Sequence, residues 1–276
     1  MNTLRIVRVA AACLTGIAVA DAALAENLVI PGSGNPQYVL GRLAEAFNKQ
    51  QSQHQVSVPT STGTAGALRD VSAGTASLGR VGRPLKDAER GKGLRYLALG
   101  RDPVVFAAGA KVTTHTITQS QIVDVYTGKI TNWRELGGAP GAIRVIGREA
   151  GDASRQAITR LIKPFENINF GEDVKVVHLD PQMIELLDRF PTSLGFLNRS
   201  ALSACKTRIV KLALDGVPPT PQNLQDGRYP LWLELGLIYK PDGLTPAGKA
   251  FIAFVQSPAG RHVLREHGIL PPVSVH

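Results

Sequence analysis

The feature that most constrains the fold of this chain is a threefold pattern in which a short apolar stretch leads into a turn of small polar residues and then into a helix. The turns span residues 31–36, 61–67 and 147–154. The first N–H groups of a helix have no intrahelical partner and the helix dipole is positive there, so such a turn can hold an anion. Small polar residues also cap ordinary helices, so one turn alone predicts no more than a cap. Three turns facing one cleft would form a cage for an oxyanion.

Strand-like and helix-like segments alternate through the first half of the chain, which is typical of an α/β fold with mostly parallel sheet. Apolar residues with helical spacing in 39–47 predict a helix with one buried face. The apolar stretch 96–108, broken by residues 100–103, predicts a crossing into a second lobe, and residues 194–197 would carry the chain back. We expect one lobe from residues 26–104 and 200–276 and another from residues 105–199.

The first 25 residues indicate a signal peptide. Arg5 and Arg8 precede an apolar run of about a dozen residues, and Ala23-Leu24-Ala25 has the small-x-small pattern of a cleavage site. The run is shorter than the roughly 20 residues that a membrane-spanning helix needs. We therefore expect a periplasmic or secreted protein without membrane insertion after cleavage, and an uncleaved anchor is the alternative.

The charge balance favours an anionic ligand without identifying it. Without the leader, which holds two arginines and one aspartate, the chain keeps 29 basic and 21 acidic residues, a formal charge of +8. Nucleic acid is disfavoured, because the basic residues are dispersed and aromatic residues make up only 5% of the chain. The single cysteine after the leader, Cys205, excludes an intrachain disulfide and a cysteine-based metal site.

The sequence offers no catalytic motif, so we expect a protein that is not an enzyme. The six histidines show no H-E-x-x-H spacing, and there is no G-x-S-x-G turn. Residues 243–250 come near a phosphate-binding loop motif, but Ala250 lacks the hydroxyl that would bind magnesium. We expect no metal and no cofactor.

Six sequence blocks carry a resemblance to a known family. The most specific is YTGKITNWRELGG at 126–138; the others are RPL at 83–85, GRE at 147–149, DGVPPT at 215–220, YPL at 229–231 and SPAG at 257–260. In their sequences and in their order along the chain, these blocks resemble the phosphate-binding proteins of bacterial phosphate ABC transporters, which have the type 2 periplasmic binding protein fold. The resemblance covers nearly the whole chain after the leader. It implies an α/β protein of two lobes, each a mostly parallel sheet flanked by helices, with the ligand cleft between them.

The resemblance also implies a function and partners. It predicts an exported, monomeric solute-binding protein that captures a small oxyanion, with phosphate favoured, by closing its lobes and delivers it to an ABC permease. The alternative left open is a protein of the same fold that senses a ligand or acts outside the cell, and that binds another anion or a zwitterion. The block at 126–138 is expected to be structural.

In the first and second turns, the resemblance assigns ligand binding to Ser33, Gly34, Asn35 and Thr64. Ser33 and Thr64 would offer hydroxyls, and the first turn would also offer backbone amides. Ser77 stands where the family has a carboxylate that accepts the proton of hydrogen phosphate, which is a departure from the family pattern.

In the third turn, Arg148 matches an arginine that pairs with phosphate, a role for which a planar bidentate donor is better than lysine. Ala153 and Ser154 complete the turn, and Ser154 matches its last hydroxyl. Asp152 replaces a serine, and a carboxylate accepts hydrogen bonds only and repels a dianion.

Two interpretations of these departures are open. Asp152 takes over the proton-accepting role, with Arg80, Arg83 or Arg155 restoring the charge balance, and phosphate still binds. Otherwise the pocket has moved to an organophosphate, another oxyanion or a zwitterion with an amine facing Asp152. Asp102, at the expected crossing, is a candidate for the second shell or for a hydrogen bond at the hinge.

Overall fold

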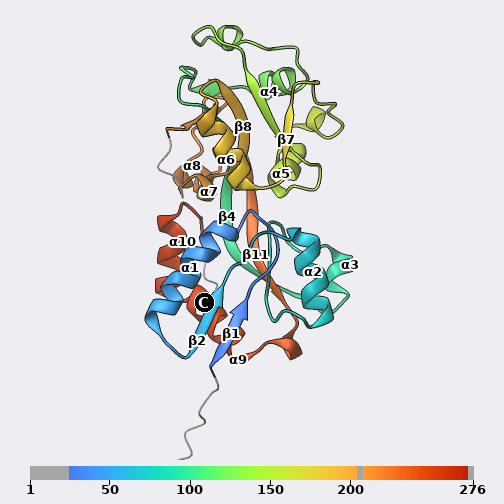
Figure 1. The fold of residues 1–276 in the computed structure, drawn as a ribbon, viewed down its shortest axis with the longest axis vertical. Helices are drawn as coiled ribbons and strands as arrows, with labels where there is room; N and C mark the ends of the chain where they lie inside the picture. Colours follow the sequence, from blue (N-terminus) through green and yellow to red (C-terminus); the bar gives the residue numbers. More distant parts are fainter. Residues whose placement is uncertain (1–24, 204–207, 273–276) are drawn as a thin grey trace, which may run out of the picture.

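The computed structural model describes residues 25–203 and 208–272. The predicted signal peptide, except Ala25, and Cys205 lie outside the described residues. The described chain forms two lobes joined by long strands (Figure 1). This confirms the predicted α/β class with two lobes.

The first lobe is the lower one in Figure 1. Its strands are β1 (Glu26–Val29), β2 (His54–Ser57) and β3 (Gly79–Val81), of which β1 and β2 pair in parallel with each other. Its helices are α1 (Gln37–Gln50), α2 (Gly63–Ala73), α3 (Asp87–Arg90), α9 (Pro246–Gln256) and α10 (Pro258–Glu266), with the 3-10 turn η3 (Pro241–Gly243) before α9.

The second lobe is the upper one in Figure 1. Its strands are β5 (Thr116–Ile117), β6 (Arg144–Arg148), β7 (Lys175–Val177), β8 (Ser193–Asn198), β9 (Val210–Lys211) and β10 (Ala213–Leu214). Its helices are α4 (Gln119–Tyr126), η1 (Trp133–Leu136), α5 (Ala153–Leu161), η2 (Lys163–Phe165), α6 (Asp180–Arg189), α7 (Arg199–Ser203) and α8 (Pro221–Gln225).

Strand β4 (Arg95–Ala108) connects the lobes. Its first part pairs antiparallel with β11 (Trp232–Tyr239) and its last part pairs antiparallel with β8, so one strand belongs to both lobes. The predicted crossing lies here, and residues 100–103 lie within the strand and not in a break between two elements. Gly100 instead has a φ of +147° beside a register shift in the β4–β11 pairing, so the Gly–Arg–Asp–Pro stretch marks an irregularity within the strand.

The main sheet is mixed, which corrects the expectation of mostly parallel sheet. Its order is β3-β11-β4-β8-β6-β7, and β9 pairs with β4. β6 pairs parallel with β7 and β8, but β11 is antiparallel to both of its neighbours. The physical reason is that β4 and β11 carry the chain between the lobes in opposite directions and pair with each other.

The predicted lobe boundaries stay a prediction. Strand pairing favours a return of the chain to the first lobe after residue 214, later than the predicted residue 200. β9 pairs with Ala107 and Ala108, and β10 pairs with β5, so residues 210–214 pair with the second lobe. β11 then carries the chain back.

The predicted buried face of the first helix is confirmed. Its buried residues are Val39, Leu40, Leu43, Ala44 and Phe47. Phe47 makes edge contacts with Phe251 and Phe254 of α9. The packing of α1 against the last helices closes the first lobe.

The block at 126–138 lies in the core of the second lobe, as expected. Tyr126 and Trp133 are buried. Tyr126 donates to the Ile146 carbonyl at 2.9 Å, and Trp133 donates to the Thr192 carbonyl at 2.8 Å. Each ring thus buries a large apolar surface while its polar atom is hydrogen-bonded. The block therefore stabilises the second lobe.

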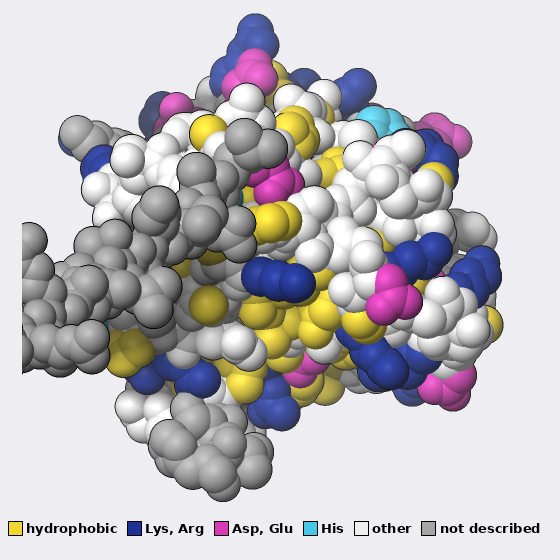
Figure 2. Space-filling model, turned by 90° about the horizontal axis from the view of Figure 1, so that it is seen from below, with side chains coloured by type: hydrophobic (Ala, Val, Ile, Leu, Met, Phe, Trp, Pro, Cys, Tyr) yellow, Lys and Arg dark blue, Asp and Glu magenta, His cyan; other side chains and the backbone are white. Residues whose placement is uncertain are grey.

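The surface gives no sign of a concentrated basic patch on the face seen in Figure 2. Lysine and arginine side chains (dark blue) are spread over that face and separated by other side chains. Within the described part of the chain, no helix has the length and apolar character needed to cross a membrane.

Candidate functional site

The first turn, residues 31–36, is held in place by hydrogen bonds from the Arg80 side chain. The Arg80 side chain is fully buried and donates from Nε to the Ser33 carbonyl at 2.8 Å and from Nη2 to the Pro59 carbonyl at 2.7 Å. It also donates to the Ile30 carbonyl and, at 3.3 Å, to Gln37. Burial lowers the pKa of Arg80 to about 10, which leaves it charged at neutral pH. Arg80 therefore stabilises the first turn, and its guanidinium donates to three backbone carbonyls and to the Gln37 side chain.

The second turn lies against the first. The Ser61 hydroxyl donates to the Gly32 carbonyl at 3.1 Å and accepts from the Gly63 N–H at 3.2 Å. Thr64 is half-buried in the first turn of α2, which begins one residue earlier. Two of the three predicted helix N-termini are therefore neighbours in the first lobe.

The third turn follows β6 and ends at α5. Asp152 is the N-cap of α5, and its Oδ1 accepts from the Arg155 N–H at 3.0 Å. Ala153 and Ser154 form the first turn of the helix and are buried. The Arg155 side chain donates to the Arg148 carbonyl at 2.7 Å and lies over the Phe170 ring. Asp152 thus fills the N-cap position of α5, where aspartate and serine are about equally favoured.

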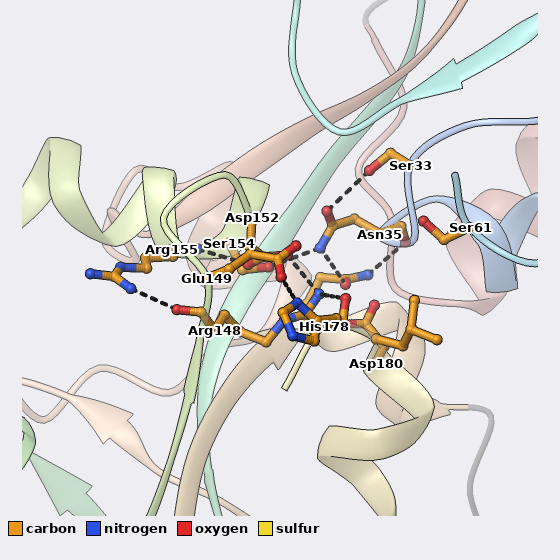
Figure 3. Close-up of polar contacts among 12 residues, drawn as sticks. Ser33, Asn35, Ser61, Arg148, Glu149, Asp152, Ser154, Arg155, His178 and Asp180 are labelled. Carbon is orange, nitrogen blue, oxygen red and sulfur yellow. Dashed lines mark hydrogen bonds and ion pairs between the residues drawn. The ribbon is translucent and has the colours of Figure 1, made fainter. Parts of the chain in front are cut away.

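Arg148 is held between two carboxylates (Figure 3). Its Nη2 lies 2.7 Å from Asp152 Oδ2 and 3.1 Å from the His178 carbonyl, and its Nη1 donates to Asp180 Oδ1. All three charged side chains are at most 5% exposed. Burial and the charge of Asp180 raise the pKa of Asp152, and Arg148 opposes this shift. The predicted phosphate-binding arginine is therefore already charge-paired within the protein.

The first and third turns meet at the junction of the lobes (Figure 3). Asn35 donates from Nδ2 to the Ser154 hydroxyl at 3.0 Å and to Asn198 Oδ1 at 3.2 Å, and its Oδ1 accepts from Ser33 at 3.3 Å. Since the Ser154 hydroxyl accepts this bond, it keeps its own proton for donation. Residues 119 apart in the sequence are thus brought into direct contact.

Asp102 lies on β4 beneath this junction. Its carboxylate accepts from Asn198 Nδ2 at 2.8 Å and from the Ser200 hydroxyl at 2.5 Å and backbone N–H at 3.2 Å. Asn198 also donates to the Asn35 carbonyl at 3.0 Å. Burial raises the pKa of Asp102 to about 6 despite these hydrogen bonds. Of the two roles considered for Asp102, the hydrogen bonds favour the hinge.

The structure does not bring Ser77 to the junction. Its hydroxyl accepts from the Thr245 N–H at 3.0 Å, at the N-terminus of α9. The residue of this segment that reaches the junction is Gly82, where a Cβ would lie 3.0 Å from Asn35 Oδ1 and 2.8 Å from the Ala153 Cβ. Ser77 lies before β3 and Gly82 directly after it, so the two residues are at opposite ends of this strand.

Arg83 is also committed elsewhere. Its guanidinium makes a two-pronged pair with Glu89, at 2.7 and 2.8 Å. Its charge is therefore balanced locally, beside α3, and does not offset Asp152.

Sequence reasoning did not include three junction residues. Asn198 is the last residue of β8, Ser200 lies in α7, and Asp180 begins α6. Asp180 could have been suspected from its place, since an aspartate before a proline at a helix start is a helix N-terminal signal. Nothing in the sequence indicates that it pairs with Arg148.

A pocket of about 560 Å³ opens beside the first turn. Gly34 and Asp180 belong to its wall, and most of the remaining wall comes from one side of α1 and from α6. No group of three His, Cys, Asp or Glu side chains in residues 25–203 and 208–272 could hold a metal ion.

Comparison with known proteins shows which family this chain belongs to. A family model described as a PBP superfamily domain matches residues 18–259. The phosphate-binding protein PstS of Bacillus subtilis is 25% identical over 257 residues, covering 89% of this chain and 80% of that protein. The PstS of Borreliella burgdorferi is 24% identical, covering 68% and 70%.

Solved structures agree with this. A protein from Clostridium perfringens assigned as a phosphate ABC transporter substrate-binding protein, with bound phosphate, has a TM-score of 0.80 and 26% identity and covers 90% of this chain and 100% of that one. An ABC-type phosphate transport receptor from Vibrio cholerae has a TM-score of 0.67 at 23% identity, covering 89% and 100%, and shows the shared fold. Because the family model matches most of the sequence, the chain belongs to the PBP superfamily domain family.

Proposed function

We propose that this chain is an exported, monomeric solute-binding protein that captures phosphate between its lobes and delivers it to an ABC permease. The observation that carries the proposal is the meeting of the first turn with the N-terminus of α5 at the lobe junction, where Asn35 and Ser154 lie 3.0 Å apart. The names of the relatives, which are phosphate-binding proteins of bacteria, support phosphate as the ligand.

Neutral donors account for most of the expected affinity. The turn amides, the Ser154 hydroxyl and the positive end of the α5 dipole can hold an oxyanion without a free cation. Arg148 contributes less than a lone arginine would, because Asp152 and Asp180 balance its charge. Both oxygens of Asp152 have partners, which leaves it poorly suited to accept a ligand proton.

Lobe closure would complete the site. The donors come from both lobes, so only the closed arrangement brings them together, and the ligand stabilises that arrangement by binding it preferentially. The hydrogen bonds among Asn35, Asn198 and Asp102 tie the first turn to both β4 and β8, and they support a role as the hinge.

We also propose that the protein has no catalytic role. The serines at the junction hydrogen-bond to Asn35 and Asp102 and not to a histidine or lysine base. The relatives are named for binding and transport, which supports the same conclusion.

The test is isothermal titration calorimetry of residues 26–276, stripped of ligand by refolding, with phosphate and with sulfate at pH 7. We expect phosphate to bind and sulfate to bind more weakly or not at all. Ser154→Ala should weaken phosphate binding about tenfold, because it removes one hydrogen-bond donor to an ion.

Ser77→Ala is the matched control, since it deletes the same hydroxyl from a residue bonded to Thr245. It should leave phosphate affinity unchanged. Absence of phosphate binding by the folded protein would refute the proposed ligand, and equal losses in the two variants would refute the proposed site.

A further inference from the structure

The pocket beside the first turn is larger than inorganic phosphate requires. Its volume of about 560 Å³ falls in the range of about 300–1,000 Å³ that is typical of sites for small organic molecules. Gly34 of the proposed phosphate-binding turn contributes to its wall, as do Tyr38 and Gly41 of α1. A molecule anchored at the turn by a phosphoryl group could therefore extend between α1 and α6.

One buried atom in the pocket wall lacks a partner. Asp180 is only 4% exposed, and while its Oδ1 accepts from Arg148, its Oδ2 has no hydrogen-bond partner among the described residues. Buried carboxylate oxygens are nearly always hydrogen-bonded, because leaving one unpaired carries a desolvation penalty. Asp180 also lines the pocket, so a small rotation of its carboxylate would expose Oδ2 to a donor on a bound molecule.

The charges around the pocket favour a cationic donor. The titratable side chains in its wall are Tyr38, Arg42, Glu45, Asp180 and Glu185. Arg42 and Glu45 pair with each other at 2.7 Å, and Arg42 also lies over the Tyr38 ring. The charged residues that α6 contributes to the wall, Asp180 and Glu185, are both acidic, so the wall has an excess of negative charge on the α6 side. An amine is better suited to it than a second acid or a neutral group.

We propose that the pocket between α1 and α6 is a subsite for the organic part of a phosphate monoester that bears an amino group, with the amine donating to Asp180 Oδ2. The inference rests on the proposed function, since the phosphoryl group would be held by the turns described above. It adds a specificity-determining residue, Asp180, and narrows the preferred ligand from phosphate to an amino-bearing phosphate ester.

The first test compares three probes by isothermal titration calorimetry: O-phosphoethanolamine, ethyl phosphate and inorganic phosphate. We expect O-phosphoethanolamine to bind about tenfold more tightly than ethyl phosphate, because a hydrogen bond to a charged group is gained. Asp180→Asn should remove most of that preference. Equal affinity for the two esters would overturn the role of Asp180.

A second test fills the pocket without touching the ion pairs. A Cβ at Gly41 would meet nothing within 4 Å, and Gly41 lies in the interior of α1, where glycine is a weak helix former. Gly41→Leu should therefore fold, retain phosphate binding and weaken O-phosphoethanolamine binding about tenfold, since its side chain occupies the subsite. Gly41→Ala is the matched control, because it raises helix propensity while leaving most of the pocket free.

The outcomes separate this inference from the proposed function. Binding of phosphate with rejection of both esters would overturn the subsite and leave the phosphate receptor standing. Absence of binding for all three probes would overturn both. Tight binding of O-phosphoethanolamine that Gly41→Leu does not weaken would overturn the placement of the subsite between α1 and α6.

Discussion

Arg148→Met tests whether the buried charge cluster at the lobe junction forms in solution. The substitution keeps most of the side-chain volume but removes the positive charge between Asp152 and Asp180, whose side chains are 4% and 5% exposed. Removing one partner of a buried ion pair costs about 3–5 kcal/mol, because the remaining charge is left uncompensated. For a chain of this size, that loss lowers the melting temperature by about 6–20 °C.

The matched control is Arg83→Met, which breaks a two-pronged pair whose side chains are 20% and 16% exposed. Because this pair is partly solvated, its loss should cost about 1 kcal/mol. Thermal unfolding of both variants at pH 7.5 gives the comparison. Equal melting temperatures for Arg148→Met and Arg83→Met would refute the reasoning, since they would mean that the Arg148 cluster is no more buried than a surface pair.

The pH dependence of Arg148→Met provides an independent check. Burial and Asp180 already raise the pKa of Asp152, and loss of Arg148 removes the charge that opposes this shift. A carboxyl whose pKa is raised on folding stabilises the fold at low pH, and that stability is lost as the pH rises. The stability deficit of the variant should therefore be largest at pH 7.5 and shrink towards pH 4.5. A constant deficit would contradict this account.

Three further predictions concern the neighbouring residues. Arg80→Met should destabilise the protein by about 3 kcal/mol or more in denaturant unfolding, because it leaves the Ile30, Ser33 and Pro59 carbonyls without their donor; a loss below about 1 kcal/mol would contradict its role beneath the first turn. Burial raises the pKa of Asp102 to about 6, above its unfolded value of about 3.9, so its contribution is greatest below about pH 4 and is lost as the pH rises through about 6. Relative to Asp102→Asn, the wild type should therefore lose up to about 3 kcal/mol of unfolding free energy between pH 4 and pH 7.5, and a flat difference would contradict the burial of the charge. Gly82→Ala should weaken phosphate binding about tenfold in calorimetry, because its methyl group would lie 2.8 Å from the Ala153 Cβ and push the N-terminus of α5 away from the first turn. Unchanged affinity would place Gly82 away from the ligand.

Local patterns in the sequence predicted most elements of the fold. The apolar spacing in 39–47 identified the buried face of α1, and small polar residues identified the turn at 31–36 before it. These features depend on residues a few positions apart, which periodicity reports directly. The direction of sheet pairing was less accessible, because β4 pairs with β11, more than a hundred residues later, and neither strand records the direction of its partner.

The candidate site was predictable in outline only. The family resemblance pointed to Ser33, Asn35 and Ser154, which the structure brings together. Ser77 was chosen from a local match, and the structure gives the position at the junction to Gly82 instead. A glycine carries no side-chain signal, so its place can be recognised only from what surrounds it.

The sequence by itself determined the α/β class, the helix faces and the helix N-termini that could hold an anion, because each is encoded within a short stretch of chain. Only the tertiary structure decided how the charges are distributed around those N-termini. From the sequence alone, Arg148 would be taken for a cation without a partner. In the folded chain it forms ion pairs with Asp152 and with Asp180, which lies 32 residues later. The physical reason is that the electrostatic character of a site depends on distances between charges and on burial, and both are set by the folded chain.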